Sequence, residues 1–281
     1  MGALAAADLA ERLGTPAIVG GITWERRPID PLPGARTLDE IKDLAERLND
    51  AVALAGPKTC GPGGFLFAES RMAEVLGAPV VLVDPNPGPR AVAAALDDAA
   101  ARLGCDLLVV LDVGGDVLAH GDEPGLASPL ADAVLLASAR FLRTPATGAV
   151  FGAGCDGELT PAEVRERLAE VGTTGQEALS PAQLDRVEAV AAAVPTEASA
   201  MALRCARGDR GEAPIRQGRR SVALTELGGV VTWFAPLRAI DTAARLAAAV
   251  QDAGSLAQAD AILEASGIRT ELAYERELAH G

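Results

Sequence analysis

Apolar runs of strand length alternate with amphipathic helical stretches through the first half of this chain, and this alternation constrains the fold more than any other feature. The apolar runs are residues 16–22, 50–55, 79–84, 106–112 and 147–152, and the helical stretches are residues 38–48, 69–77, 89–104 and 128–142. Continuous Val- and Leu-rich strands separated by helices are typical of a parallel sheet covered on both faces. We therefore predict an α/β fold with an open, mainly parallel, Rossmann-like sheet and helices on both faces.

The second half has a different pattern, in which helical stretches dominate. They are residues 161–172, 180–194, 197–208, 238–253 and 255–266, with a basic stretch (216–227) and a short apolar run (228–236) between the third and the fourth. Ser128-Pro129 and Thr160-Pro161 each place an N-cap residue before a proline, which indicates a helix start. We interpret residues 1–160 as the parallel sheet region and residues 161–281 as a helix-rich part packed on the same domain.

The composition limits the partners. Of 281 residues, 49% are hydrophobic but only 3% aromatic, so Ala, Val and Leu must fill the core. A formal net charge of −14 repels polyanions, which argues against nucleic-acid and membrane partners. We find neither a run of about 18 uncharged apolar residues nor a signal peptide, and expect no membrane span. The four cysteines show no CxxC spacing, which favours a reducing cytoplasm over a disulfide framework or a zinc site.

The start of the chain departs from the pattern. Residues 3–13 read as a helix at once, so a first strand and the loop after it are lacking. In doubly wound sheets that first strand-to-helix turn commonly carries the phosphate-binding glycines. Either the protein dispenses with this turn, or its natural start lies upstream of Met1.

Five longer strings carry a resemblance to a known family. They are GGITWERRPIDPLPG (20–34), FAESR (67–71), DVGGDVLAHGDEPGLASPLADAVLLA (112–137), FGAGCDGELT (151–160) and VPTEASA (194–200). Together they resemble the bacterial and archaeal family called domain of unknown function 1152 (DUF1152), over nearly the whole chain. Members of that family typically begin with a glycine-rich GGGGD-type strand-to-helix turn, and this chain resembles them from just after it. The resemblance implies a fold and a set of positions more than a reaction.

Acidic residues and glycines crowd the end of the predicted strand at 106–112. Asp112 stands at its carboxyl end, Gly114 and Gly115 let the backbone turn sharply, and Asp116 follows on the same turn. Because ligands of open α/β sheets collect at such strand ends, Asp112 and Asp116 are candidate ligands of Mg²⁺ or candidate acid–base groups. The alternative is that both bind turn amides. The following loop and helix start add further candidate ligand-binding residues: His120, Asp122 and Ser128.

The segment 151–161 (FGAGCDGELTP) is a second candidate cluster after another predicted strand. Gly154 and Cys155 resemble part of a G-x-nucleophile-x-G elbow, which makes Cys155 a candidate nucleophile with His120 as its candidate base. Asp156 and Glu158 add acids to the same rim as candidate proton-transfer groups. The alternative is a glycine-rich loop in which Cys155 is a small buried residue.

Other strand ends carry further candidates. Trp24 could stack on a base or sugar while Arg26 binds a phosphate, or Trp24 could pack beneath its loop. Glu69 opens a predicted helix, and Asp84 follows a strand as Asp112 does. The arginines at 216–220 form the main positive patch, and they are either a solvated loop or a site for phosphate or an acidic partner.

Three functions fit these patterns. The first is an enzyme that performs hydrolysis or group transfer on a small polar metabolite with a sugar, nucleoside or phosphate part, using carboxylates at strand ends. The second is a hydrolase or acyltransferase with Cys155 as nucleophile. The third is a non-catalytic metabolite-binding protein. Abundant apolar helices also allow a homo-oligomer, without indicating the number of subunits.

Overall fold

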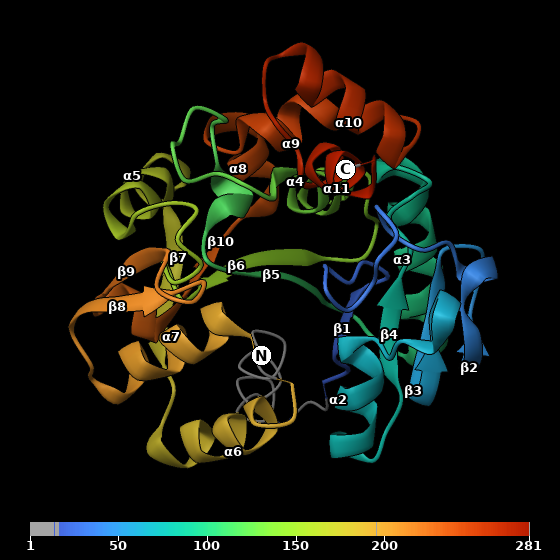
Figure 1. The fold of residues 1–281 in the computed structure, drawn as a ribbon, viewed down its shortest axis with the longest axis horizontal. Helices are drawn as coiled ribbons and strands as arrows, with labels where there is room; N and C mark the ends of the chain where they lie inside the picture. Colours follow the sequence, from blue (N-terminus) through green and yellow to red (C-terminus); the bar gives the residue numbers. More distant parts are fainter. Residues whose placement is uncertain (1–13, 15–16, 195, 281) are drawn as a thin grey trace.

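The computed structural model describes residue 14 and residues 17–194 and 196–280, which form a mixed α/β fold (Figure 1). The described strands make two four-stranded sheets and one hairpin. The first sheet contains, in spatial order, β1 (Gly20–Ile22), β4 (Val80–Val83), β3 (Val52–Cys60) and β2 (Lys42–Arg47). The second contains β5 (Leu108–Val113), β6 (Ala146–Phe151), β10 (Val230–Phe234) and β7 (Thr173–Ala178). The hairpin pairs β8 (Gly211–Ile215) with β9 (Arg220–Leu224).

Most neighbouring strands are antiparallel, so the prediction of one mainly parallel sheet is not confirmed. Only β1 with β4 and β5 with β6 pair in parallel. β2, β3 and β4 are antiparallel neighbours, and β10 runs antiparallel between β6 and β7. A continuous apolar run reports that a strand is buried on both faces, but it carries no information on the direction of the neighbouring strand.

The helix predicted at 38–48 is wrong. Only Leu38–Glu40 is helical, as the short 3-10 turn η1, and the residues after it form β2. Leu38, Ile41 and Leu48 are buried, as the predicted helix would have buried them. A short turn followed by a strand buries these same three apolar residues, because the pairing of β2 with β3 shifts in register.

The other predicted helices are present, with small shifts at their ends. They are α2 (Ala68–Leu76), α3 (Pro89–Leu103), α4 (Pro129–Ser138), α5 (Pro161–Val171), α6 (Pro181–Ala191), α7 (Glu197–Arg207), α8 (Pro236–Thr242), α9 (Arg245–Val250) and α10 (Leu256–Ala265). The stretch predicted at 238–253 divides into α8 and α9. The sequence pattern missed the β8–β9 hairpin and α11 (Glu271–His280). The predicted helix at 3–13 lies outside the described residues.

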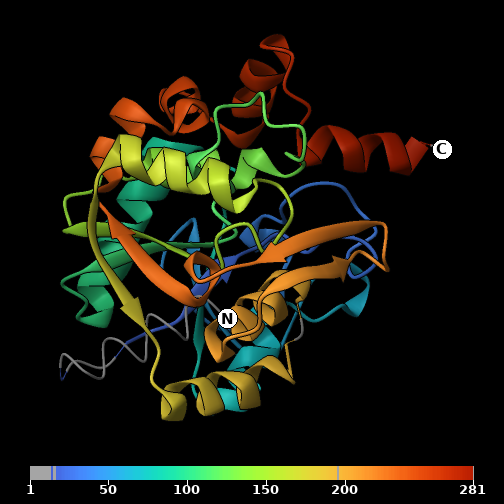
Figure 2. The same ribbon diagram turned by 90° about the vertical axis from the view of Figure 1, so that its left-hand side faces the viewer.

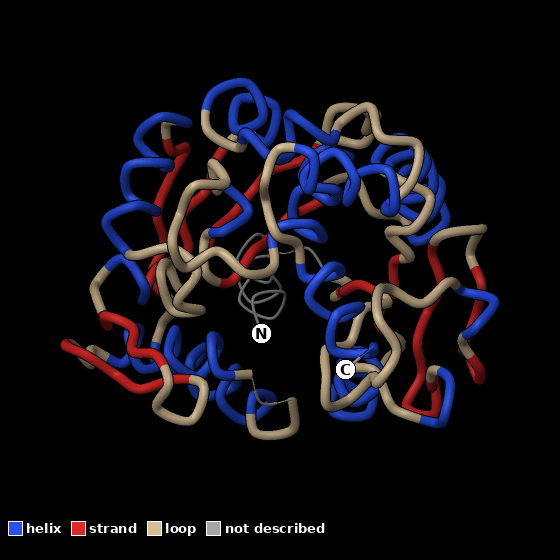
Figure 3. Tube along the Cα trace, turned by 45° about the horizontal axis from the view of Figure 1, so that its top comes forward, coloured by secondary structure: helices blue, strands red, loops and turns tan. Residues whose placement is uncertain are grey.

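The second sheet is buried on both faces at its inner strand β6, whereas its edge strand β7 is largely exposed. Val150 of β6 packs into an apolar cluster with α4, α5, α8 and α9. Its neighbours Ala149 and Phe151 point the other way, into a cluster with α7 and the β8–β9 hairpin. Figure 1 shows α4, α8 and α9 on one side of this sheet and α7 with the hairpin on the other. In Figure 3 the strands (red) have helices beside them in both sheets. None of the described helices is long and apolar enough to cross a lipid bilayer.

Candidate functional site

Two loops meet at the carboxyl ends of β5 and β6. The backbone N–H of Gly154 donates to the carbonyl oxygen of Gly114 across 2.7 Å, which ties the loops together. Gly114 has a φ of +145°, and a Cβ there would lie 2.4 Å from the Asp156 carboxyl carbon. Only glycine therefore lets the first loop approach the Asp156 carboxylate this closely.

Five carboxylates gather where these loops meet the start of α4. Three of them, Asp112, Asp116 and Asp132, have oxygens within 4.8 Å of one another, and so do Asp116, Asp156 and Glu158. We call these five residues the acid cluster. Asp116 belongs to both sets of three. The structure thus brings together the four acids that the sequence singled out at these strand ends, and it adds Asp132 from the first turn of α4.

Asp116 is a buried member of the acid cluster whose carboxylate accepts no hydrogen bond among the described residues. It is only 6% exposed. Burial, followed by repulsion from Asp132 and Asp112, raises the pKa of Asp116 well above 3.8. A buried carboxylate without a donor is costly, so this position either holds a proton or requires a cation.

Three other acids of the cluster, Asp112, Asp156 and Glu158, accept hydrogen bonds, whereas no hydrogen bond to the Asp132 carboxylate is present among the described residues. Asp112 accepts the Gly115 N–H at 2.6 Å, and Asp156 accepts the Glu158 N–H at 3.2 Å. Burial still raises the pKa of Asp112 to about 6. Burial, with repulsion from Asp112 and Glu158, raises the pKa of Asp156 to about 7. Burial and repulsion from Asp112 and Glu271 also raise the pKa of Asp132 well above 3.8.

Carboxylates of the protein occupy the N-terminus of α4. Glu158 accepts the N–H groups of Ala127 and Ser128 at 2.7 and 2.8 Å, and the Ser128 hydroxyl lies 2.5 Å from its other oxygen. The sequence predicted that the Ser128 side chain caps α4, and this prediction is wrong: no capping hydrogen bond is formed by that side chain. Glu271 of α11 accepts the next N–H groups, those of Leu130 and Ala131, both at 2.9 Å. These amides are not available to an anionic ligand.

Trp24 and Arg26 belong to a buried network with α11. Trp24 is 6% exposed and donates its indole N–H to Glu275, which favours the alternative that it packs beneath its loop. Arg26 lies over the Trp24 ring at 4.5 Å and pairs with Glu271 and Glu275 at 3.2 and 3.4 Å. The Arg26 charge also lowers the pKa of Asp132, against the larger effect of burial, so it lies beside the acid cluster.

His120, Asp122 and Glu123 form a third set of potential metal ligands. Glu123, however, already accepts the N–H groups of His120 and Gly121, each at 2.8 Å, and pairs with Arg167. Burial alone would raise the pKa of Glu123, but these donors lower it overall. His120 contacts Glu170 at 3.2 Å. The Glu123 carboxylate is thus held by donors within the protein.

The thiol of Cys155 is not placed as a nucleophile. Cys155 is fully buried, and its Sγ lies 3.8 Å from the Sγ of Cys205 on α7. The contact with Cys205, together with burial, raises the pKa of the Cys155 thiol. A thiol with no exposed surface and a raised pKa is a poor nucleophile. The geometry therefore supports the alternative in which Cys155 is a small core residue.

Glu69 and Asp84 lie at the other sheet, apart from the acid cluster. Glu69 contacts Gly21 of β1, where a Cβ would lie 1.8 Å from its oxygen. Burial raises the pKa of Glu69 to about 8. Asp84 follows β4 and accepts the backbone and side-chain N–H groups of Asn86, both at 2.8 Å. Asp84 thus closes a turn, and neither residue contributes to the two sets of three that share Asp116.

Arg216 belongs to the basic stretch that the sequence offered as either a solvated loop or a phosphate site, but it was not placed beside the acid cluster. It lies at the tip of the β8–β9 hairpin, with Nη2 3.8 Å from Glu158 Oε1. The basic stretch was a visible signal, but only the hairpin brings one of its arginines to the acid cluster.

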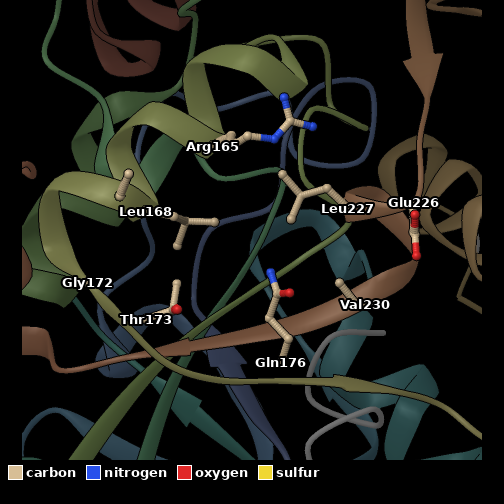
Figure 4. Close-up of a pocket in the computed structure, with 9 residues that line it drawn as sticks. Arg165, Leu168, Gly172, Thr173, Gln176, Glu226, Leu227 and Val230 are labelled. Atoms are coloured by element: carbon tan, nitrogen blue, oxygen red, sulfur yellow. The ribbon is translucent and has the colours of Figure 1, made fainter.

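A separate cavity of about 660 Å³ lies beside α5, β7 and β10 (Figure 4). Arg165 and Glu226 are its only charged lining residues, and none of the predicted site residues lines it. The cavity therefore adds no carboxylate chemistry to the acid cluster.

The fold and the acid cluster define an α/β protein whose carboxylates converge at the ends of parallel strands. The chain belongs to a family described as a protein of unknown function, DUF1152, whose family model matches residues 1–279, as the resemblance implied. Neither the curated proteins nor the solved structures contain a match to this chain.

Proposed function

We propose that this protein is a divalent-cation-dependent enzyme that hydrolyses, or transfers the phosphoryl group of, a small phosphate-bearing metabolite at the acid cluster. The observation that carries the proposal is Asp116. Its buried carboxylate lacks a hydrogen-bond donor among the described residues and lies within 4.8 Å of four other carboxylates. Such an arrangement is unfavourable for the ionised group by itself and becomes favourable around cations.

The two overlapping sets of three carboxylates match the donor set of a two-cation centre. Asp112, Asp116 and Asp132 would hold one cation, and Asp116, Asp156 and Glu158 the other. Carboxylate oxygens are hard ligands that suit Mg²⁺ or Mn²⁺. Pairs of such ions stabilise the attacking and leaving oxygens of a phosphoryl transfer.

The chemistry balances with water alone in the hydrolytic case. The oxygen of water forms a bond to phosphorus as the ester P–O bond breaks. The leaving alkoxide takes up the proton that the water loses. The acid cluster contributes by holding the cations and by orienting the phosphoryl group between them.

The four cysteines are free thiols, which suits a reducing compartment such as the cytoplasm. We include a cytoplasmic location in the proposal for this reason.

Calorimetric titration of the metal-free protein with Mn²⁺ tests the proposal. We expect two ions per chain, and a loss of affinity of at least about tenfold in the Asp116→Asn variant. Release of inorganic phosphate from a panel of phosphate esters should require Mg²⁺ or Mn²⁺ and should be lost in the same variant. Asp252→Asn is the matched control, because it removes an exposed carboxylate outside the acid cluster. The proposal fails if the wild type binds no cation, or if Asp116→Asn binds Mn²⁺ as the wild type does.

A further inference from the structure

The β8–β9 hairpin is closed by the four residues 216–219, which begin with a β-turn of unusual composition. Arg216 and Gln217 have φ values of +51° and +57°, and the Gly218 N–H donates to the Ile215 carbonyl at 3.0 Å. Two successive positive φ values in a hairpin loop are usually supplied by Asn-Gly, because other side chains are strained there. The turn therefore does not require arginine at position 216.

The hairpin (orange in Figure 2) is held by α7 on one side and by the two site loops on the other. Glu197, the first residue of α7, accepts the Arg216 N–H with both oxygens, at 2.8 and 3.0 Å. Arg220 donates to the carbonyl oxygens of Gly125 and Gly157, at 3.0 and 3.1 Å, and so joins the two site loops. These contacts hold the tip in place without the Arg216 side chain.

The Arg216 guanidinium has little to bind within the protein. Its side chain is 36% exposed, and its one ion pair among the described residues is the contact with Glu158 at 3.8 Å, longer than a hydrogen bond. Arg26, the other arginine beside the acid cluster, is engaged by two carboxylates of α11. Arg216 therefore keeps unused N–H donors next to the proposed cation site.

The charges explain why a phosphate ligand needs this arginine. Two divalent cations would leave the five carboxylates of the acid cluster with one uncompensated negative charge. A phosphate monoester brings up to two more. A guanidinium at the rim offsets one of these negative charges, and its planar fork can donate two parallel hydrogen bonds to phosphoryl oxygens.

We propose that Arg216 binds the phosphoryl oxygens of a phosphate monoester held at the acid cluster and selects such esters over uncharged substrates. This assignment rests on the proposed function and deepens it. Arg216 is a substrate-binding residue in this proposal, and Glu158 holds its guanidinium in position while no ligand is bound.

Binding of inorganic phosphate, measured by calorimetry with and without Mg²⁺, tests the assignment. We expect the wild type to bind phosphate in the presence of Mg²⁺, and Arg216→Gln to lose at least about tenfold in phosphate affinity while binding Mg²⁺ within about twofold of the wild type. Arg216→Lys, which keeps the charge but not the fork, should lie between them. Arg204→Gln is the control, because Arg204 is a partly exposed arginine on α7 that pairs with Asp209.

The outcomes separate this assignment from the proposed function. If the wild type binds no Mg²⁺ but binds phosphate through Arg216, the cation-dependent function fails and the assignment stands. Equal phosphate affinity in Arg216→Gln and the wild type overturns the assignment, as does a wild type that binds no phosphate under either condition. Should Arg216→Gln unfold, the phosphate affinity of Arg216→Lys decides. A phosphate affinity of Arg216→Lys equal to that of the wild type would contradict binding by the planar guanidinium. Acetate is titrated in parallel, and an acetate affinity equal to the phosphate affinity would overturn the assignment of Arg216 to phosphoryl oxygens.

Discussion

Removing one charge from the acid cluster should stabilise the metal-free protein, and the gain should grow with pH. Asp156 is the best position, because burial and repulsion from Asp112 and Glu158 raise its pKa to about 7. In the unfolded chain an aspartate ionises near pH 4. An acid whose pKa is raised by folding supports the folded state fully below about pH 4, and this support is lost as the pH rises toward about 7.

The magnitude follows from the two pKa values. Each tenfold difference in acidity is worth about 1.4 kcal/mol, so Asp156 destabilises the folded chain by about 4 kcal/mol at about pH 8, where it is ionised. At about pH 5.5 the destabilisation is about 2 kcal/mol, because the folded chain keeps a proton there that the unfolded chain has released. Asp156→Asn avoids this cost. Asp112, whose pKa is about 6, gains as well when its charged neighbour is removed, so the two effects cannot be added independently.

Urea unfolding in the presence of a chelator, followed by tryptophan fluorescence, measures the effect. We expect Asp156→Asn to be more stable than the wild type at both pH values, with a difference about 2 kcal/mol larger at about pH 8. The exposed Asp252→Asn should show no such pH dependence. Saturating Mg²⁺ should stabilise the wild type more than the variant, since only the intact cluster binds the ions fully. Repulsion at this site is refuted if Asp156→Asn is less stable than the wild type at about pH 8, or if the stability difference between them does not change with pH. Either result would show that the neighbouring carboxylates do not repel Asp156.

Two further predictions concern the loops and the thiols. Gly114→Ala should destabilise the protein by about 1–3 kcal/mol and weaken Mn²⁺ binding, because the added Cβ meets Asp156 at a strained φ. Urea unfolding and Mn²⁺ titration check this. Gly104→Ala is the control, because a Cβ at that position meets nothing within 4 Å. A thiol reagent should label the partly exposed Cys60 and Cys105 before Cys155 and Cys205 in the folded protein. Mass spectrometry of the labelled peptides decides, and rapid labelling of Cys155 would restore it as a candidate nucleophile.

The acid cluster could be predicted in part because strand ends and glycines are visible in the chain. Asp112 and Asp116 follow one apolar run, and Asp156 and Glu158 follow the next, so their convergence required only that β5 and β6 be parallel neighbours. Asp132 was missed as a member because it lies within a helical pattern, where an acid at the first turn is explained by the helix dipole. The arginines at 216–220 were visible as a possible phosphate site, but the position of Arg216 beside the acids could not be predicted, because it depends on the β8–β9 hairpin.

The errors in the fold have similar causes. Lys42–Arg47 became a strand because β3 offers a partner, and cross-strand pairing outweighs a local apolar spacing that suits a helix equally well. The direction of β10 could not be predicted from its apolar run. This strand lies between β6 and β7 in the sheet although it is distant from both in the sequence, so no short connection fixes its direction.

The position of α11 has a practical consequence for anyone who modifies this protein. Glu271 binds amides at the start of α4 that precede it by about 140 residues, and Glu275 binds Trp24 and Gly34 near the other end of the chain. A stop codon before Glu271, or a purification tag that pulls this helix away, would uncap α4 and release Arg26 next to Asp132. A series of C-terminal deletions should therefore disturb cation binding long before it removes any residue of the acid cluster.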